Sequence, residues 1–379
     1  MSDDLAPRPG ITLADNQRLD WLRLIRSENI GPATFIELIK RFGTASNALE
    51  ALPDIVKKAR GHKIKIASRE TVERELDQIY GLGGRTVCLG EPDYPKALRA
   101  ADAPPPVLTV RGNSDILHRD IIAFVGSRNA SLAGCKFTQS LAKEVGAAGY
   151  ATSSGLARGI DAAAHQATLD TGTIAVFAGG IDHIYPHQNE KLAHQIVEHG
   201  GLLVSEMPFG WKPRAQDFPR RNRIVAGLAL GLVVVEAAKR SGSLISARLA
   251  NEMGRLVFAV PGSPLDPRSE GANLLIKQGA QLVSEAQDIV QAISPLTGAH
   301  QQASYSLEED GEYSSDDPPS DDDRAALLNA LGPTPTNIDE LVRFTGIELG
   351  KLQFMLLELD LAGKLERQSG NRVSLNLSD

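Results

Sequence analysis

The stretch Ile121-Ile122-Ala123-Phe124-Val125-Gly126-Ser127-Arg128 is an apolar run that ends in a turn containing glycine and serine. It predicts a buried strand, and Cys135–Ala148 after it has the pattern of a helix. Further strands are predicted at Tyr150–Ser153, Ile174–Phe177, Leu202–Val204, Leu232–Val235, Leu256–Ala259 and Gln281–Val283. Strands and helices alternating in this way over residues 85–298 predict an α/β domain with a doubly wound parallel sheet. Ligands of such sheets bind at the carboxyl ends of the strands.

Three other segments flank this domain. Residues 1–84 have helical spacing and predict an all-α domain, in which the turn Ile30-Gly31-Pro32 is either a helix-hairpin-helix element or a packing turn. Residues 299–323 are acidic and rich in Pro and Ser, which predicts a disordered linker. Residues 324–379 predict three helices and a hairpin, the pattern of a winged helix.

Composition favours a cytoplasmic protein with no membrane segment. Cys88 and Cys135 are the two cysteines of the 379 residues, which indicates a reducing compartment and no disulfide framework. Met1 to Arg8 carries acids and no apolar run, so we expect no signal peptide. The longest apolar run, Ile224 to Val235, is too short to span a bilayer and is interpreted as a buried strand with its approach.

The net charge of −7 taken alone would oppose nucleic-acid binding, but the charge is unevenly distributed. Nine acids and no Lys or Arg lie between Glu308 and Asp323. Without them, 40 basic residues face 38 acidic ones. Because salt screens exposed charges beyond roughly 10 Å, a basic groove elsewhere in the chain is compatible with this total.

Three predicted strands are followed by turns suited to phosphate. The turns are Gly126-Ser127-Arg128, Ser153-Ser154-Gly155 and Ser241-Gly242-Ser243. Glycine lets the backbone approach an anion closely, and the start of the next helix supplies free N–H groups. One such turn can serve packing alone, but three on one edge predict a phosphate-lined trough.

The segment Phe218-Pro219-Arg220-Arg221-Asn222-Arg223 places an aromatic ring beside three guanidinium groups. In isolation it could be a solvated helix face, but here it precedes a predicted buried strand. Arginine binds phosphate, and an aromatic ring can stack on a base. Phe218 can equally pack in the core. The combination favours a nucleic acid over a small metabolite.

Catalytic and metal-binding interpretations are weaker. Neither G-x-x-x-x-G-K-[ST] nor G-x-G-x-x-G occurs, so we expect neither ATP hydrolysis nor a bound dinucleotide, and no cofactor. Asp161 and His165 share a helix face and could act in acid–base or metal chemistry, but local capping and packing are favoured. His183, His187 and His194 lack a carboxylate at metal-site spacing, which argues against a metal.

The predicted winged helix is poorly charged for DNA. Residues 324–379 hold six Lys and Arg against seven Asp and Glu. The candidate recognition helix Glu348–Leu361 has one basic residue, Lys351. Since phosphate contacts need cations, a protein-contact role is favoured over DNA reading.

Taken together, these motifs resemble the DprA/Smf family of bacterial DNA-processing proteins. The motifs, in chain order, are Tyr94-Pro95, Ala103-Pro104-Pro105 ahead of a strand, Val125-Gly126-Ser127-Arg128, Ser154-Gly155-Leu156-Ala157-Arg158-Gly159-Ile160-Asp161, Ala164-His165, Phe218-Pro219-Arg220-Arg221-Asn222-Arg223-Ile224, Val235-Glu236-Ala237, Lys239, Ser241-Gly242-Ser243-Leu244, Val260-Pro261-Gly262 and Gly271-Ala272-Asn273-Leu274-Leu275-Ile276. They cover most of the chain. The helical and winged-helix domains also suit the family's longer members.

The resemblance implies an extended Rossmann-like core with an N-terminal domain of SAM or helix-hairpin-helix type and a C-terminal winged helix. It implies a non-catalytic homodimer that binds single-stranded DNA and helps to load the RecA recombinase during natural transformation. The implied DNA-binding residues are Arg128; Ser154, Gly155, Gly159 and Asp161; Phe218, Arg220, Arg221, Asn222 and Arg223; and Lys239, Ser241, Gly242 and Ser243. The extra residue in Lys239-Arg240-Ser241 leaves open which of the two cations faces DNA.

Alternatives remain at this point: a phosphoribohydrolase of a related fold, a nuclease, or an adaptor whose DNA binding is incidental. Pro261-Gly262 is followed by Ser263-Pro264, so the P-G-G-x-G-T-x-x-E motif of phosphoribohydrolases is not matched. We predict that Arg221→Ala with Arg223→Ala abolishes DNA binding without unfolding the chain.

Overall fold

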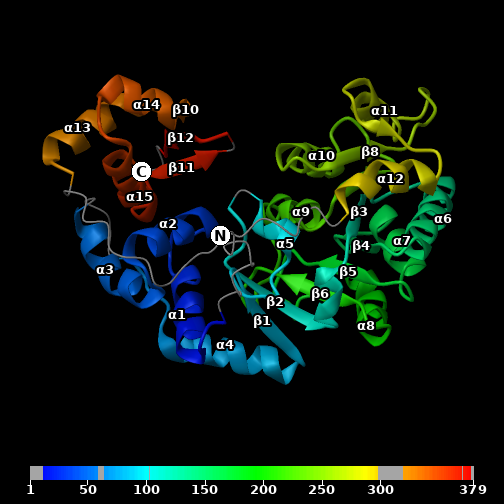
Figure 1. The fold of residues 1–379 in the computed structure, drawn as a ribbon, viewed down its shortest axis with the longest axis horizontal. Coiled ribbons are helices and arrows are strands. Elements are labelled where there is room, and N and C mark those ends of the chain that lie inside the picture. The colour runs from blue at the N-terminus through cyan, green and yellow to red at the C-terminus, as the bar shows by residue number, and fades with distance from the viewer. Residues whose placement is uncertain (1–11, 59–63, 102, 298–318, 369, 377–379) are drawn as a thin grey trace, which may run out of the picture. The chain divides into compact units, whose positions relative to one another are not determined.

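The computed structural model describes residues 12–58, 64–101, 103–297, 319–368 and 370–376. They belong to two compact units. One combines Met1–Thr12 with Arg74–Ser306, and the other combines Leu13–Glu73 with Leu307–Asp379. The two units are described separately below, and Figure 1 labels their elements.

The first unit is built on a nine-stranded sheet with the order β1-β2-β6-β5-β4-β3-β7-β8-β9. The strands are β1 (Gly84–Cys88), β2 (Val107–Gly112), β3 (Ile121–Val125), β4 (Ala151–Ser154), β5 (Thr173–Val176), β6 (Leu202–Ser205), β7 (Gly231–Val234), β8 (Leu256–Ala259) and β9 (Gln281–Leu282). From β3 the chain steps outward to β6 and then returns to β7 on the other side of β3. This reversal is the topological switch point of a doubly wound fold.

All seven predicted strands are present, and two of them, Ile121–Val125 and Leu256–Ala259, have the predicted bounds. Neighbouring strands from β3 to β9 in this sheet run parallel. The difference from a purely parallel sheet lies at one edge, where β2 pairs antiparallel with β6 and β1 pairs antiparallel with β2. The sequence patterns do not predict β1, because five residues of mixed composition show no clear strand pattern. Strand β1 forms through its antiparallel pairing with β2.

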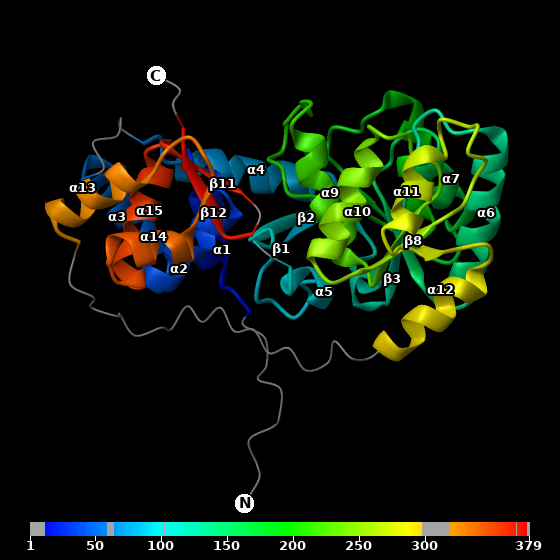
Figure 2. The ribbon, with the colours of Figure 1, turned by 90° about the horizontal axis from the view of Figure 1, so that it is seen from above.

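Helices cover both faces of the sheet (Figures 1 and 2). One face carries α6 (Leu132–Ala147), α7 (Ile160–Ala167), α8 (Glu190–Glu198) and α12 (Ala286–Ile293), which share two apolar clusters with the strands. The other face carries α9 (Asp217–Leu228) and α10 (Gly242–Glu252), which pack against each other. The remaining elements of this unit are α4 (Arg69–Gly81), which begins in the other unit, α5 (Lys96–Arg99), α11 (Glu270–Lys277), and the short 3₁₀ turns η1 (Ser114–His118), η2 (His187–Asn189) and η3 (Ser294–Leu296).

The second unit joins helices from both ends of the chain. Its elements are α1 (Asp15–Ile25), α2 (Pro32–Phe42), α3 (Ala45–Lys58), α13 (Asp321–Ala330), β10 (Thr336–Asn337), α14 (Ile338–Thr345), α15 (Leu349–Leu361), β11 (Leu365–Gln368) and β12 (Arg372–Leu375). The last six form the winged helix, with the order β10-β12-β11 in its small sheet. Most of the predicted linker 299–323 lies outside the described residues. Helix α13 begins within it, three residues before the predicted start, because the Ser320 hydroxyl caps the amide of Asp323 at 3.1 Å.

Among the described residues, no helix is both long enough and apolar enough to cross a membrane.

A buried polar network holds α7 to the sheet. The hydroxyl of Thr152 lies 2.7 Å from that of Thr168 and 2.8 Å from that of Thr173. The Nδ1 atom of His165 lies 2.7 Å from the Thr173 hydroxyl, and burial lowers the pKa of His165 to about 3. His165 is therefore neutral in the folded protein.

We expect the stability of this unit to fall as pH falls from about 6.5 towards 3, because only the unfolded state can protonate His165 across that window. The loss attributable to His165 at pH 5 is about 2 kcal/mol. Urea unfolding at pH 7.5 and pH 5 should show it, and His165→Gln should reduce the difference. The exposed His194 provides the matched control, since His194→Gln should retain the full difference. An identical pH response in the wild type and His165→Gln would contradict the prediction.

Candidate nucleic-acid interface

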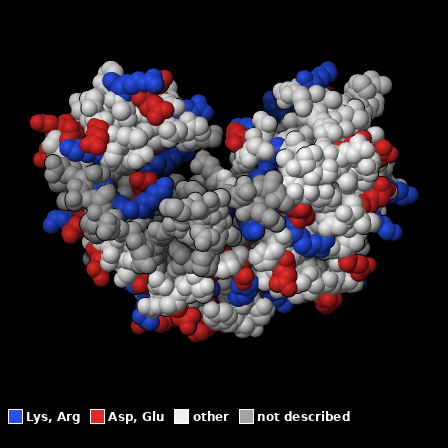
Figure 3. All heavy atoms as spheres, viewed as in Figure 1, with Lys and Arg blue, Asp and Glu red and all other residues white. Residues whose placement is uncertain are grey.

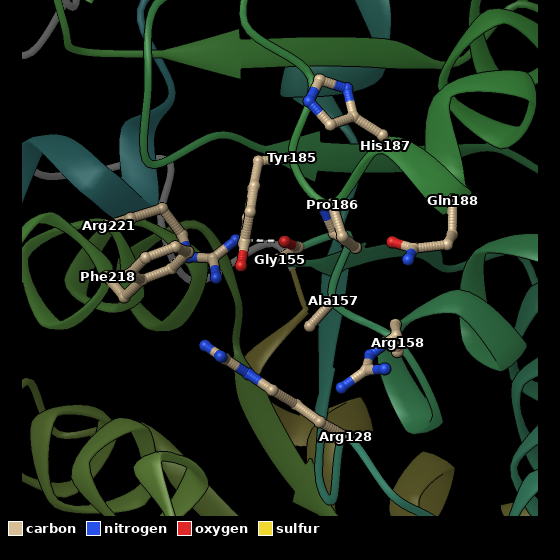
Figure 4. Close-up of a pocket in the computed structure, with 10 residues that line it drawn as sticks. All are labelled: Arg128, Gly155, Ala157, Arg158, Tyr185, Pro186, His187, Gln188, Phe218 and Arg221. Atoms are coloured by element: carbon tan, nitrogen blue, oxygen red, sulfur yellow. Dashed lines mark hydrogen bonds between the residues drawn. The ribbon is translucent and has the colours of Figure 1, made fainter. Parts of the chain in front are cut away.

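A cavity of about 330 Å³ opens at the carboxyl ends of β3, β4 and β5, beside α9 (Figure 4). This is the edge where the topology places ligands. It is lined by Arg128, Gly155, Ala157, Arg158, Tyr185, Pro186, His187, Gln188, Phe218 and Arg221. Four residues predicted from the sequence therefore meet here: Arg128, Gly155, Phe218 and Arg221.

Arg221 is fixed inside the protein. The basic segment lies on α9, which precedes the buried strand β7 as predicted, and Arg221 is only 5% exposed. One of its terminal nitrogens donates to the carbonyl of Val176 at 2.7 Å and to that of Gly155, the bond drawn in Figure 4. Burial lowers the pKa of Arg221 to about 10, so it stays protonated at neutral pH. Arg221 therefore anchors the turn after β4 instead of extending freely into solvent.

Asp161 secures the same turn from the start of α7. Its carboxylate accepts the amides of Gly155 at 3.1 Å and Ala157 at 3.3 Å. Burial raises the pKa of Asp161, and the charge of Arg221 opposes that rise. The turn Ser153-Ser154-Gly155 is predicted to bind phosphate, but Asp161 already accepts the Gly155 amide, which is therefore not available to an anion. The structure also favours the capping role for Asp161 over an acid–base role.

Two glycines allow this close packing. A Cβ atom on Gly155 would lie 2.1 Å from the Arg221 guanidinium. Gly159 has φ +75°, and a Cβ atom there would lie 2.2 Å from the Ser127 carbonyl. Both positions therefore require glycine for the contact between neighbouring turns.

The rim of the cavity carries exposed cations and aromatic rings. The Arg128 guanidinium lies 5.1 Å from the centre of the Phe218 ring. The Tyr185 ring lies 5.6 Å from Phe218, at an interplanar angle of 58°. Arg128, Arg158 and His187 are exposed. The rim thus offers charge for phosphates and aromatic surface for a base.

At the first predicted phosphate turn, Gly126-Ser127-Arg128, the start of the following helix is already occupied by a carboxylate of the protein. The Glu236 carboxylate accepts from the amide of Ser131 at 2.9 Å and from its hydroxyl at 2.5 Å, at the start of α6. A carboxylate therefore occupies the place that an anionic ligand would take at this helix N-terminus. Arg128 remains as the cationic contribution of this turn.

Other predicted residues make contacts away from the cavity lining. Arg223 donates to Glu206 and to the carbonyl of Ala103, the latter at 3.1 Å. The Asn222 side chain accepts from Arg221 at 3.1 Å, and the Ser154 hydroxyl donates to the carbonyl of Phe124 at 2.6 Å. Arg220 is exposed on α9 and does not line the cavity. Arg221 and Arg223 are thus held by internal contacts, so removing both is expected to affect folding as well as binding.

The third turn also lies outside the cavity lining. Lys239 is 71% exposed and lies 3.6 Å from Glu270, and Arg240 is exposed. The Ser241 hydroxyl caps α10 by accepting the amide of Ser243 at 3.3 Å, with Gly242 as the first residue of the helix. These residues can extend a surface for a nucleic-acid strand beyond the cavity, but they do not form the cavity wall.

Sequence reasoning missed six lining residues: Ala157, Arg158, Tyr185, Pro186, His187 and Gln188. Arg158 lay within a quoted motif, and its position after β4 was an available signal. The loop of Tyr185 and His187 was considered only for metal binding. Its position after β5 on the ligand edge could have identified it.

The site has limited means for metal or acid–base chemistry. Among the described residues, no group of three or more His, Cys, Asp or Glu is placed to hold a metal ion. His165 is buried and engaged with Thr173, and it does not line the cavity. What the lining can do is bind an anion and stack a planar group.

Comparisons with known proteins identify the family of the chain. Residues 85–294 match the model of DNA recombination-mediator protein A. Residues 15–77 match the DprA-like N-terminal HHH domain, and residues 312–371 match the DprA winged helix domain.

Relatives resemble most of the chain. Protein Smf of Escherichia coli is 40% identical over 292 residues, covering 74% of this chain and 75% of that protein. Protein Smf of Synechocystis is 31% identical over 397 residues, covering 95% and 99%.

Two solved structures are also similar. DNA processing protein A of Streptococcus pneumoniae has a TM-score of 0.60 and 32% identity, covering 74% of this chain and 98% of that one. DNA processing protein A of Helicobacter pylori, described with a single-stranded DNA binding mode, has a TM-score of 0.51 and 29% identity, covering 56% and 96%. With all three of its domains matched in order, the chain belongs to the DprA/Smf family of DNA-processing proteins.

Proposed function

We propose that this protein binds single-stranded DNA at the cavity of its α/β domain and acts in DNA processing during transformation and recombination. The observation that carries the proposal is the exposed Arg128 guanidinium beside the Phe218 ring, at the mouth of a cavity whose floor is fixed by Arg221. Phosphates would contact Arg128 and Arg158, and a base would stack on Phe218 or Tyr185. The Helicobacter relative, described as binding single-stranded DNA, supports the assignment.

The finer parts of the proposal follow from family membership. We propose that the protein works without catalysis, as a cytoplasmic homodimer, and helps to load the RecA recombinase. Lys239, Arg240 and Arg220 would contact the strand outside the cavity, while Ser154, Gly159 and Asp161 hold the turns in place.

Fluorescence anisotropy of a labelled single strand across a salt series tests the central claim. Binding should weaken as salt rises, and duplex of equal length should compete poorly, because its stacked bases cannot reach the aromatic rings. Equal competition by duplex would contradict the stacking arrangement. Free base released from AMP would instead indicate a phosphoribohydrolase, and magnesium-dependent shortening of the strand would indicate a nuclease.

We expect Arg128→Ala with Arg158→Ala to weaken single-strand binding and leave folding intact, because both side chains are exposed. The slope of log K against log salt should become shallower by about 0.7 for each phosphate contact removed. The control is Arg248→Ala, an exposed arginine on α10 that faces Glu252 at 3.6 Å. Equal losses in the double variant and the control would place the binding site elsewhere.

We expect Phe218→Ala to cost about 1–3 kcal/mol of binding free energy, the usual range for a stacked base. Anisotropy and urea unfolding should be measured on the same variant. A loss of binding with unchanged stability supports stacking. A loss of stability with unchanged affinity would assign Phe218 to packing alone, and Phe218→Leu, which keeps apolar volume, would then restore stability.

Arg221→Ala should mainly unfold the α/β domain. It removes the bonds to the carbonyls of Gly155 and Val176 and leaves the buried Asp161 carboxylate without its cationic neighbour. Leaving a buried charge without its compensating partner typically costs about 3–5 kcal/mol. Urea unfolding should show a stability loss far larger than that of Arg220→Ala, its exposed neighbour on α9. Matching stabilities for the two variants would refute the anchoring role.

A further inference from the structure

The winged helix contains a helix, α15, that is buried around its whole circumference from Phe354 to Leu359, whereas Leu349 and Gln353 nearer its start are exposed. Eight residues of α15 are buried: Leu352, Phe354, Met355, Leu356, Leu357, Glu358, Leu359 and Leu361. Four of them, Leu352, Met355, Leu356 and Leu359, belong to the apolar core of the winged helix itself. Phe354, Leu357 and Leu361 are buried outside that core. A helix segment buried on all sides needs a second neighbour, and residues buried in this way are not available to enter a DNA groove.

The second neighbour is the N-terminal helical domain. The Thr34 hydroxyl on α2 donates to the Asp360 carboxylate at 2.7 Å. The Arg41 guanidinium lies 3.6 Å from the centre of the Phe354 ring. Figures 1 and 2 show α15 beside the helices of the N-terminal domain, and it contacts both α2 and α3. Helices from opposite ends of the chain thus share one apolar interface.

The hairpin turn of the N-terminal domain lies at the same interface. Asn29, directly before the turn Ile30-Gly31-Pro32, donates its side-chain amide to the carbonyl of Leu361 at 3.1 Å. Its side-chain nitrogen lies 3.3 Å from the position of a Cβ atom on Gly363. The turn that could have presented amides to a phosphate is therefore packed against the end of α15.

The charges here are also unsuited to DNA. The Asp360 carboxylate pairs with Arg367 at 3.0 Å, and the nearly buried Glu358 carboxylate pairs with Arg324 at 2.9 Å. A phosphate approaching this part of α15 would meet these carboxylates, and Arg324 and Arg367 are already paired with them. On the face drawn in Figure 3, basic and acidic side chains are interspersed around α13 and α14. Phosphate binding instead requires gathered positive charge.

We propose that α15 is the docking surface for the chain's own N-terminal helical domain, and that this contact stays closed while the α/β domain binds DNA. Neither the candidate recognition helix nor the hairpin turn then reads DNA. The two terminal domains act as one body, joined by the apolar side chains of α15 and by the contacts of Asn29, Thr34 and Arg41. The second half of the inference rests on the proposed function, whereas the first half does not.

Hydrogen exchange of the full chain, with and without an excess of oligo-dT, tests both halves. Peptides from α2 and α15 should exchange slowly and equally in the two samples. Fast exchange of α15 in the free chain would overturn the docking claim. Deprotection of α15 on adding oligo-dT would overturn the claim that the contact stays closed. Absence of any oligo-dT binding in parallel anisotropy would count against the proposed function and leave the free-chain result valid.

A matched pair of substitutions isolates the contact. Thr34 is 3% exposed and faces Asp360, so Thr34→Glu places two carboxylates together, whereas Thr34→Lys supplies a countercharge. We expect exchange of α2 and α15 to rise at least about tenfold in Thr34→Glu and less in Thr34→Lys, as expected for an uncompensated charge at a buried contact. Equal exchange in the two variants would overturn the docking claim.

The same pair tests the separation from DNA binding. Single-strand affinity should stay within about twofold of wild type in both variants, because the proposed phosphate contacts all lie in the other unit. A tenfold fall in Thr34→Glu with affinity retained in Thr34→Lys would show that the closed terminal body contributes to binding. A gain in affinity for Thr34→Glu would show that opening exposes a DNA-binding surface. Either result would overturn the statement that neither element reads DNA.

Discussion

The architecture of the cavity depends on a buried pair of opposite charges, Asp161 and Arg221, which secure one turn from two sides. The Asp161 carboxylate accepts hydrogen bonds from the amides of Gly155 and Ala157, and the Arg221 guanidinium donates to the carbonyl of Gly155. Burying ions is costly, so the pair persists because each charge compensates the other and satisfies backbone groups that would otherwise be left unpaired. The rigid turn then fixes where the exposed residues of the rim project.

This arrangement gives arginines within one small region different tasks. Arg221 and Arg223 are held by internal acceptors, whereas Arg128 and Arg158 remain exposed at the cavity. An exposed guanidinium can exchange solvent and counterions for phosphate, but a buried one has no comparable freedom. The Glu236 carboxylate accepts the amide at the start of α6. At that turn an anion can therefore be bound by the Arg128 side chain and not by helix amides.

In the terminal domains, too, groups that could bind DNA are engaged in internal contacts. Each contains an element of a kind that binds DNA in other proteins, and the two elements pack against each other through Asn29, Thr34 and Asp360. The apolar circumference of α15 explains why this packing is stable. Under the proposed function, DNA binding is concentrated in the α/β domain, and the terminal domains serve contacts with proteins.

The sequence by itself determined the order of elements, because strand and helix periodicity and the glycine turns are local properties; all seven predicted strands occur, from Ile121–Val125 to Gln281–Leu282. It also identified the family through its ordered motifs, and it placed Arg128 and Phe218 on the ligand edge. Only the tertiary structure decided the antiparallel edge formed by β1, the burial of Arg221 and the entry of Tyr185 into the cavity wall. The physical reason is that the exposure of a side chain and its hydrogen-bond partners depend on segments distant in sequence. Arg220 and Arg221 are adjacent arginines, and the sequence alone does not tell which of them faces solvent and which is buried.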